Sequence, residues 1–189
     1  MDTPLADGLP ARSGSVATIR SARLDLVSLD RRSMEAILDG RLRDAEHRLG
    51  LVLAPDIEMA MGLLRVRLAD LRSVPQVQPW LLRIVAVREP TRRMVGFVGF
   101  HGPPNGRGEV EVGYEILAGD RRQGYATEAA AALLDWAARE HGVRHFVASV
   151  SPLNAPSLGV VDKLGFRQDG SQWDLTGGTE LVFRLDLPD

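Results

Sequence analysis

The chain has 189 residues, 44% of them hydrophobic and 25% charged, a composition typical of one soluble globular domain. Its 23 basic and 25 acidic residues give a formal charge of -2, so it lacks the basic excess by which proteins usually bind nucleic acid. Cysteine is absent, which excludes disulfides, thiolate metal sites and a cysteine nucleophile, and no apolar run approaches the ~18 residues of a membrane-spanning helix.

Residues 1–17 are rich in Gly, Pro, Ser, Ala and Asp and predict a frayed tail, followed by a single domain over residues 18–189. The tail has no basic start followed by an apolar block, as a secretory signal would, so the expected location is the cytoplasm. Alternation around Leu24 and Leu26 predicts a first strand over residues 18–29.

Two helices are predicted next. Asp30 is expected to cap a short helix that carries Met34 and Ile37 on one face and stops at Gly40. Asp56 is expected to cap a second helix that runs to about Arg72. The apolar side of that helix would hold Ala60, Leu63, Leu64, Leu68 and Leu71.

Three strand-like runs follow, over residues 80–87, 94–100 and 109–117, with connections short enough for antiparallel hairpins. An Ala-rich helix is predicted from about Gln123 to His141, then a buried strand over 145–150 and a short helix that ends at Gly165. Two last strands are expected over 166–174 and 180–187, joined by a TGG turn. This order predicts an α/β (α+β) fold with a single mixed, mainly antiparallel sheet flanked by helices.

The segment from Arg121 to Glu128 directly follows a strand and opens the longest helix. A helix N-terminus presents unpaired N–H groups and a partial positive charge, which suits a phosphate group. Gly124 would let the backbone approach a ligand closely. The segment lacks the Gly-Lys-Ser/Thr of a P-loop and the three glycines of a dinucleotide fingerprint. These residues alone leave open a solvated turn with two surface arginines.

The strand EVEVGYE has a period of two, which places Glu109, Glu111, Gly113 and Glu115 on one face. Such a face is either the wet side of a half-buried strand or a cleft wall that uses a carboxylate. The four histidines lack metal-ligand spacing, so no metal site is predicted. For His101, which begins the loop before this strand, a surface or capping role is expected.

The pattern Arg121-x-x-Gly124-x-Ala126 resembles the coenzyme-binding signature of the GNAT superfamily of N-acetyltransferases. The wider match, EVGYEILAGDRRQGYATEAAAALLDWA and then SPLNAPSLGVVDKLGFRQDG, is similar to the branch that contains the ribosomal-protein N-terminal alanine and serine acetyltransferases. This match covers about residues 109–170, and the element order from Thr18 onward is compatible with the GNAT fold.

The resemblance implies acetyl-CoA as cosubstrate, without a metal. The pantetheine arm would lie between the ends of the 109–117 and 145–150 strands, bonded by backbone groups near Ile116 and Leu117. Asn154 would contact the arm, and Ser157 would lie near the sulfur. The diphosphate would rest on the N–H groups of Arg121, Arg122, Gln123, Gly124, Tyr125, Ala126 and Thr127.

Two catalytic groups are also implied. Glu111 matches the position where many members place a carboxylate base, which is needed because an ammonium cannot attack a thioester. Glu109 is the alternative base. Many members have a tyrosine seven residues after the asparagine that matches Asn154, but here that position is Val161. Ser157 therefore either donates a hydrogen bond to the departing sulfur or caps the short helix.

The expected function is transfer of an acetyl group from acetyl-CoA to a primary amine, by direct attack in a ternary complex. The acceptor is either a protein N-terminus or a small-molecule amine, and the sequence does not distinguish them. One alternative is a non-catalytic coenzyme A-binding module of the same fold, and another is a phosphate- or nucleotide-binding domain of a different type. Nucleic acid and membranes are not expected partners, and the sequence leaves open whether the chain forms a homodimer.

Overall fold

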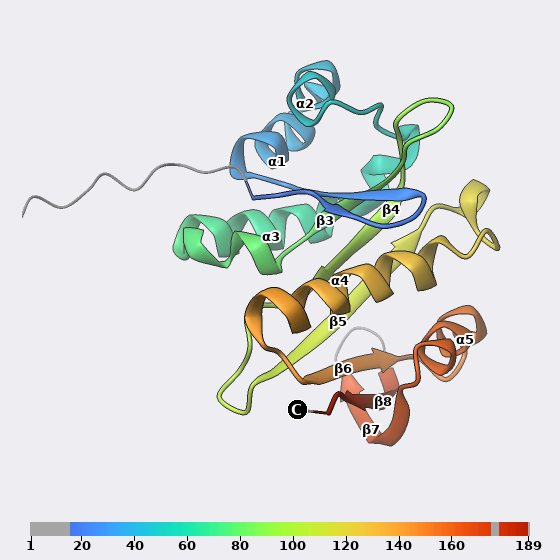
Figure 1. Ribbon diagram of the computed structural model, residues 1–189. Helices are drawn as coiled ribbons and strands as arrows, with labels where there is room; N and C mark the ends of the chain where they lie inside the picture. The colour runs from blue at the N-terminus through green and yellow to red at the C-terminus, as the bar shows by residue number, and fades with distance from the viewer. Residues whose placement is uncertain (1–15, 175–177, 189) are drawn as a thin grey trace, which may run out of the picture.

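A single sheet of eight strands runs through the computed structural model, which describes residues 16–174 and 178–188. The strand order is β1-β2-β3-β4-β5-β6-β8-β7. All neighbouring pairs are antiparallel except β5 and β6, which are parallel. The predicted mixed, mainly antiparallel sheet flanked by helices is confirmed (Figure 1). The predicted tail falls almost wholly on residues 1–15, outside the described residues.

The order of strands and helices along the chain broadly follows the prediction. The strands are β1 (Ile19–Arg20), β2 (Leu24–Ser28), β3 (Arg83–Val87), β4 (Arg93–Phe100), β5 (Glu109–Ile116), β6 (His145–Val150), β7 (Arg167–Asp174) and β8 (Gly178–Asp186). The helices are α1 (Arg31–Leu38), α2 (Leu42–Leu49), α3 (Met61–Ser73), α4 (Tyr125–His141) and α5 (Ala155–Lys163), with 3-10 turns η1 (Pro55–Ala60), η2 (Pro75–Trp80) and η3 (Ala118–Asp120).

The N-terminal part differs from the prediction in three places. The single strand expected over 18–29 is two strands, β1 and β2, that pair with each other across a turn at residues 21–23. Helix α2 was not predicted, because its buried contribution is only Ala45 and Leu49. Asp56 does not cap the next helix, since it lies inside η1, and α3 begins later at Met61. Asp30 does cap α1, by accepting a hydrogen bond from the Ser33 N–H.

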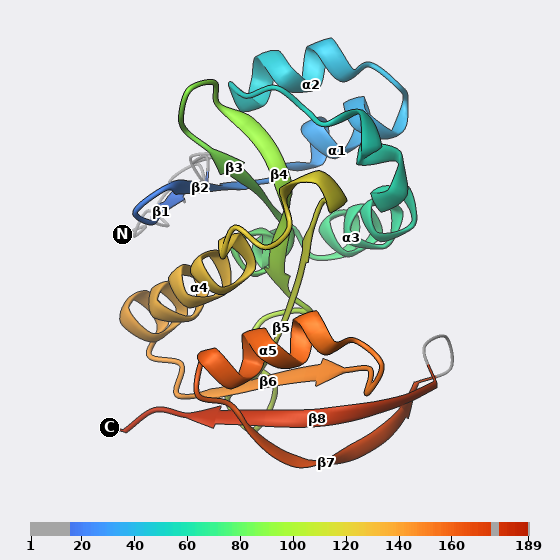
Figure 2. The ribbon, with the colours of Figure 1, turned by 90° about the vertical axis from the view of Figure 1, so that its right-hand side faces the viewer.

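The helices cover the two faces of the sheet and divide the apolar core in two. Helices α1 to α3 pack on one face with residues such as Ile84 and Phe97, and α4 and α5 pack on the other with residues such as Val98 and Phe146. Figure 2 shows α3 and α4 on opposite sides of β4 and β5.

Strands β5 and β6 pair at their beginnings and then separate. Their parallel register joins residues 109–111 to residues 145–147 and extends no further in the described chain. The later part of β5 pairs with β4 alone, up to Ile116. The sheet therefore has an opening between the C-terminal ends of two neighbouring strands, where the pantetheine arm is expected.

Candidate active site

The loop that leads into α4 contains two residues in the left-handed region of backbone conformation. Arg122 and Gly124 both have positive φ angles, 63° and 79°. Arg122 is the one non-glycine residue with positive φ in the described chain, and such conformations tend to occur at ligand sites. No described side chain caps the N-terminus of α4, so its first N–H groups point out of the helix unpaired. The loop is anchored just upstream by Asp120, which receives two hydrogen bonds from Arg93 at 2.8 and 2.9 Å.

A second segment, the turn between β1 and β2, braces this loop. The Glu128 carboxylate in the first turn of α4 accepts hydrogen bonds from the Ser21 hydroxyl and from the Arg23 backbone and side chain, each at 2.7 Å. Arg23 also donates to the Gln123 carbonyl at 3.0 Å and lies over the Tyr125 ring. Burial raises the pKa of Glu128, but the bonds from Ser21 and Arg23 lower it overall, so the brace is ionic at neutral pH. Sequence reasoning missed it, because its partners lie more than a hundred residues apart.

The opening between β5 and β6 exposes backbone groups of Ile116. The Leu117 N–H donates to the Val95 carbonyl on β4 at 2.9 Å. Backbone groups alternate in direction along a strand, so those of Ile116 face the opening. The Ile116 carbonyl accepts from Arg121 Nε at 3.0 Å, which leaves the Ile116 N–H as the group available to a ligand. The two expected positions therefore differ: Leu117 has its N–H occupied, whereas Ile116 does not.

Helix α5 closes the other side of the opening. Asn154 is its N-cap, with Oδ1 accepting from the Ser157 N–H at 3.2 Å. Capping is thus done by Asn154 and not by the Ser157 hydroxyl, which removes capping from the two roles considered for that serine. Val161 is buried in the α4-side core. The Tyr114 hydroxyl, from β5, donates to the Ser157 carbonyl at 3.2 Å and ties the two sides together. Burial raises the pKa of Tyr114, so its hydroxyl stays protonated.

Glu111 lies where the paired part of β5 ends, with its side chain 30% exposed. Its carboxylate is 3.5 Å from His101 Nδ1 at the end of β4. The hydrogen bond with His101 is the main reason that its pKa lies below the ordinary value; burial opposes this, and a hydrogen bond with Ser149 adds to it. Glu111 is therefore ionised at neutral pH and able to receive a proton. His101, expected to have a surface or capping role, is exposed and is also the neighbour of this carboxylate.

Glu109 lies on the same face of β5 as Glu111 but in a different environment. Its carboxylate forms an ion pair with Arg184 of β8 and accepts a hydrogen bond from Asn105 at 3.0 Å. The hydrogen bonds from Asn105 and then Arg184 lower its pKa. Both oxygens are therefore engaged in holding β5 to β8 and to its own preceding loop. Of the two candidate bases, Glu109 is held in an ion pair with an arginine, whereas Glu111 has His101 as its neighbour.

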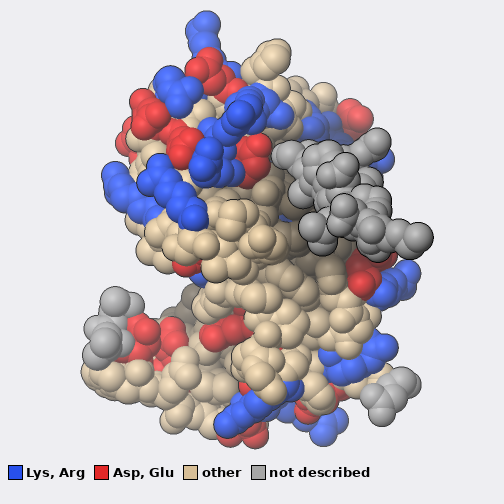
Figure 3. All heavy atoms as spheres, turned by 90° about the vertical axis from the view of Figure 1, so that its left-hand side faces the viewer, with Lys and Arg blue, Asp and Glu red and all other residues tan. Residues whose placement is uncertain are grey.

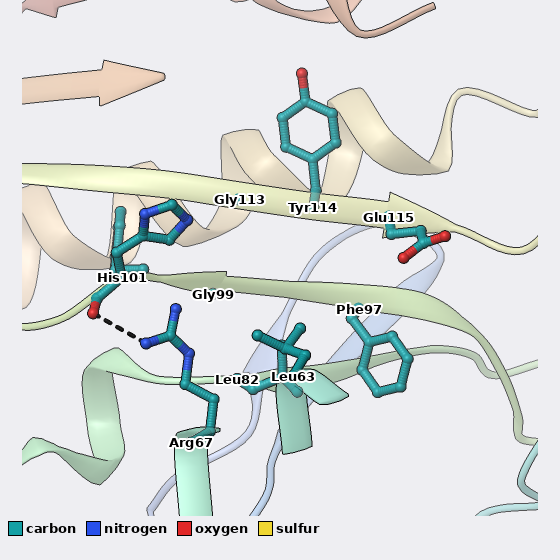
Figure 4. A pocket seen from close by; sticks show the side chains of 10 residues that line it. Leu63, Arg67, Leu82, Phe97, Gly99, His101, Gly113, Tyr114 and Glu115 are labelled. Atoms are coloured by element: carbon teal, nitrogen blue, oxygen red, sulfur yellow. Dashed lines mark hydrogen bonds between the residues drawn. The ribbon is translucent and has the colours of Figure 1, made fainter. Parts of the chain in front are cut away.

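A pocket of about 140 Å³ lies between α3 and strands β4 and β5, and His101, the neighbour of Glu111, is one of its lining residues. Figure 4 shows His101 and Arg67 at one end and Phe97 and Glu115 at the other, while the Tyr114 ring points to the opposite side of β5. Gly113 forms part of the wall, and a Cβ there would lie 3.1 Å from His101 Nε2. The glycine therefore lets the imidazole lie flat against β5.

A second, wider pocket of about 290 Å³ adjoins the first and shares Arg67 and His101 with it. Its other lining residues come from α3, η2 and the loop after β4, and include Asp70 and Val74. Figure 3 shows the surface hollowed between the α1–α3 part of the molecule and the β7–β8 ribbon, with acidic side chains along the lower edge of the hollow. The two pockets meet at Arg67 and His101, and the His101 ring contacts the Glu111 carboxylate.

The described part of the chain offers neither a metal-binding cluster nor a membrane-spanning helix. Among residues 16–174 and 178–188, no three His, Asp or Glu side chains are grouped so that they could hold a metal ion. Within the same ranges, no helix is long and apolar enough to span a membrane.

Comparison with known proteins agrees with this geometry. The family model of the acetyltransferase (GNAT) domain matches residues 31–167. The N-acetyltransferase YjdG of Bacillus subtilis, a protein described as uncharacterized, is 34% identical over 82 residues, which are 43% of this chain and 49% of that protein. The chain thus aligns with about half the length of the curated relatives it matches.

Solved structures extend the similarity to nearly the whole chain. The acetyltransferase of Agrobacterium tumefaciens is 27% identical, with a TM-score of 0.62, over 95% of this chain and 100% of that one. RimJ of Mycobacterium smegmatis, solved with a CoA disulfide, is 21% identical, with a TM-score of 0.60, over 88% of this chain and 84% of that one. The second match shows a common fold. Because the family model covers well over half of the residues, the chain belongs to the GNAT acetyltransferase domain family.

Proposed function

We propose that this chain transfers an acetyl group from acetyl-CoA to a primary amine, with residues 18–189 acting as one catalytic domain. The observation that carries the proposal is the position of β5. One end of this strand lines the opening beside the α4 loop, and its carboxylate face lines the pocket. Donor and acceptor would thus meet at Gly113 and Tyr114. The acceptor is either a protein N-terminus, as the name of a fold neighbour such as ribosomal-protein-S5-alanine acetyltransferase of Vibrio fischeri suggests, or a small-molecule amine.

The chain's donor set fits a coenzyme with a diphosphate. The unpaired N–H groups of residues 121–127, the αL backbone at Gly124 and the cations Arg121 and Arg122 suit a diphosphate anion. The Ile116 N–H and the side-chain amide of Asn154 would serve as donors to the pantetheine arm. When bound, acetyl-CoA would supply a thioester, whose acyl carbon is open to attack by a neutral amine.

Glu111 is the proposed base. It would take a proton from the incoming ammonium, directly or through one water molecule, while His101 holds its carboxylate in place. At pH 7 this step costs about 1 kcal/mol for an N-terminal amine of pKa ~7.8 and about 4.6 kcal/mol for a lysine of pKa ~10.4. The amine nitrogen would then bond to the acyl carbon as the carbon–sulfur bond breaks. No covalent acetyl-enzyme on cysteine is available, since the chain has no cysteine.

Ser157 is the proposed donor to the departing sulfur. Its hydroxyl is not used in capping α5, since Asn154 fills that role. A thiolate of pKa ~8.5 is a tolerable leaving group near neutral pH, so one hydrogen bond can be sufficient without full protonation. The Tyr114 hydroxyl supports this arrangement by fixing the Ser157 backbone.

The experiment that tests the function is an acceptor screen with acetyl-CoA that detects release of free thiol. The panel contains short peptides, aminoglycosides and polyamines, and acetyl-CoA binding is measured separately by calorimetry. We expect binding in the micromolar range and turnover with at least one class of amine. Binding without turnover on any amine would favour the non-catalytic coenzyme-binding module, and binding of ATP in place of acetyl-CoA would contradict both.

A further inference from the structure

Arg67 is a largely buried cation at the junction of the two pockets. Its side chain is 13% exposed and projects from α3 toward β4. Nη1 donates to the His101 carbonyl at 3.2 Å and to Asp70 Oδ2 at 3.1 Å. These two bonds use both hydrogens of Nη1. The packing of α3 does not require an arginine at this position, because the buried residues of the helix are leucines.

The other nitrogens of Arg67 are open to a ligand. Nη2 and Nε donate to no side chain or carbonyl in the described chain. They are not sealed from solvent either, because Arg83 Nε is the one fully buried side-chain nitrogen or oxygen without a partner among the described residues. Figure 4 shows one free guanidinium nitrogen directed toward the strands, away from the helix. Three N–H groups in a rigid planar fork therefore remain for an oxygen acceptor in the pocket.

Arg67 is also close to the proposed base. A single residue separates them: Arg67 bonds to the carbonyl of His101, and the ring of His101 contacts the Glu111 carboxylate. The Arg67 guanidinium thus lines the pocket, and the Glu111 carboxylate lies beside the His101 ring, which lines the same pocket. This pair matches a ligand that carries an ammonium and an oxygen acceptor on neighbouring atoms.

We propose, resting on the acetyl-transfer function above, that Arg67 is a specificity residue that binds the carbonyl or carboxylate oxygen next to the reacting amine. The acceptor is therefore an α-amino carbonyl compound, either a free amino acid or the first residue of a peptide. Polyamines and aminoglycosides are disfavoured, because a second ammonium would meet the guanidinium in a partly desolvated site. A plain alkylamine leaves the desolvated guanidinium without an oxygen, and this absence costs binding of the transition state.

The test compares two acceptors, alaninamide and isopropylamine, in which a carboxamide group on the amine-bearing carbon is replaced by a methyl group. The measured quantity is the ratio of their kcat/KM values, in the wild type and in Arg67→Met. The intrinsic basicity of each amine cancels between the two proteins, as in a double-mutant cycle. We expect the ratio to fall at least tenfold in Arg67→Met and at least threefold in Arg67→Lys, which keeps the charge but loses the fork. Free alanine, run in parallel, separates a carboxylate preference from a carbonyl preference.

The matched control is Arg65→Met, an exposed arginine on the same helix, which should leave the ratio within twofold of wild type. Melting temperatures accompany each variant, and if Arg67→Met does not fold, Arg67→Lys decides by the threefold criterion. A ratio that changes by less than twofold in the folded Arg67 variants overturns the inference while leaving acetyl transfer intact. A wild type that binds acetyl-CoA but acetylates neither acceptor, nor any amine of the screen, overturns the proposed function itself.

Discussion

Replacement of Gly124 by valine tests whether the loop before α4 holds the coenzyme. Gly124 is the N-cap of α4 and has φ of 79°, in the left-handed region. An L-residue with a side chain pays about 1–2 kcal/mol there. A Cβ would lie 3.5 Å from Arg23 Nη2, an ordinary contact, so the substitution strains the backbone without a clash. For a domain of this size the strain corresponds to a fall in melting temperature of about 2–8 °C.

The same substitution places a branched side chain over the N–H groups expected to bind the diphosphate. We expect the dissociation constant for acetyl-CoA to rise at least tenfold, which is about 1.4 kcal/mol, with the fold retained. Isothermal calorimetry measures the affinity, and thermal denaturation measures the stability.

Gly142 provides a matched control at the other end of the same helix. It is the C-cap of α4, has φ of 68°, and a Cβ there meets nothing within 4 Å. Gly142→Val should therefore carry a similar backbone strain and leave acetyl-CoA affinity within twofold of wild type. If Gly124→Val binds acetyl-CoA as tightly as the wild type, or if both variants lose affinity equally, the assignment of this loop is wrong.

Further predictions concern the proposed base Glu111, the Ser157 hydroxyl near the departing sulfur, and the contact between Arg23 and Glu128. Glu111→Gln should lower turnover at pH 7, with partial rescue as rising pH deprotonates the amine, whereas Glu109→Gln should keep turnover near that of the wild type. Steady-state rates measured from pH 6 to 9 test this prediction. Turnover of Glu111→Gln within twofold of wild type would exclude Glu111 as the base. In the stability curve, the depressed pKa of Glu111 contributes stability above its ordinary value near 4.5, which is lost as pH falls through the lower folded value. Ser157→Ala should cut turnover about tenfold while coenzyme affinity and melting temperature stay unchanged, since capping belongs to another residue; normal turnover would leave the sulfur without a side-chain donor. Arg23→Ala should weaken acetyl-CoA binding about threefold or more by releasing Glu128 and the loop, and calorimetry showing unchanged affinity would mean that the loop keeps its shape without the brace.

Short-range sequence patterns predicted most of the fold and the part of the site expected to bind acetyl-CoA. Helix α4 was predicted from its Ala-rich run, and its stop at Gly142 depends on one residue's left-handed backbone. The alternation that puts Glu111 and Gly113 on one face is a property of any extended strand. The elements that the sequence did not predict, η1 and α2, are short, and their few buried residues give only a weak periodic pattern.

The amino-acid sequence by itself predicted the order of the elements from β3 onward, the glycine turn at Gly124 and the carboxylate face of β5, because each depends on short-range patterns of residues. Tertiary structure alone decided the partners of the two candidate carboxylates. Glu109 is paired with Arg184, 75 residues away, whereas Glu111 lies beside His101. Arg67 likewise carries no local signal, since α3 becomes a pocket wall only after it packs across β4. Contacts between distant segments depend on how helices and strands stack, and no short-range spacing encodes that arrangement.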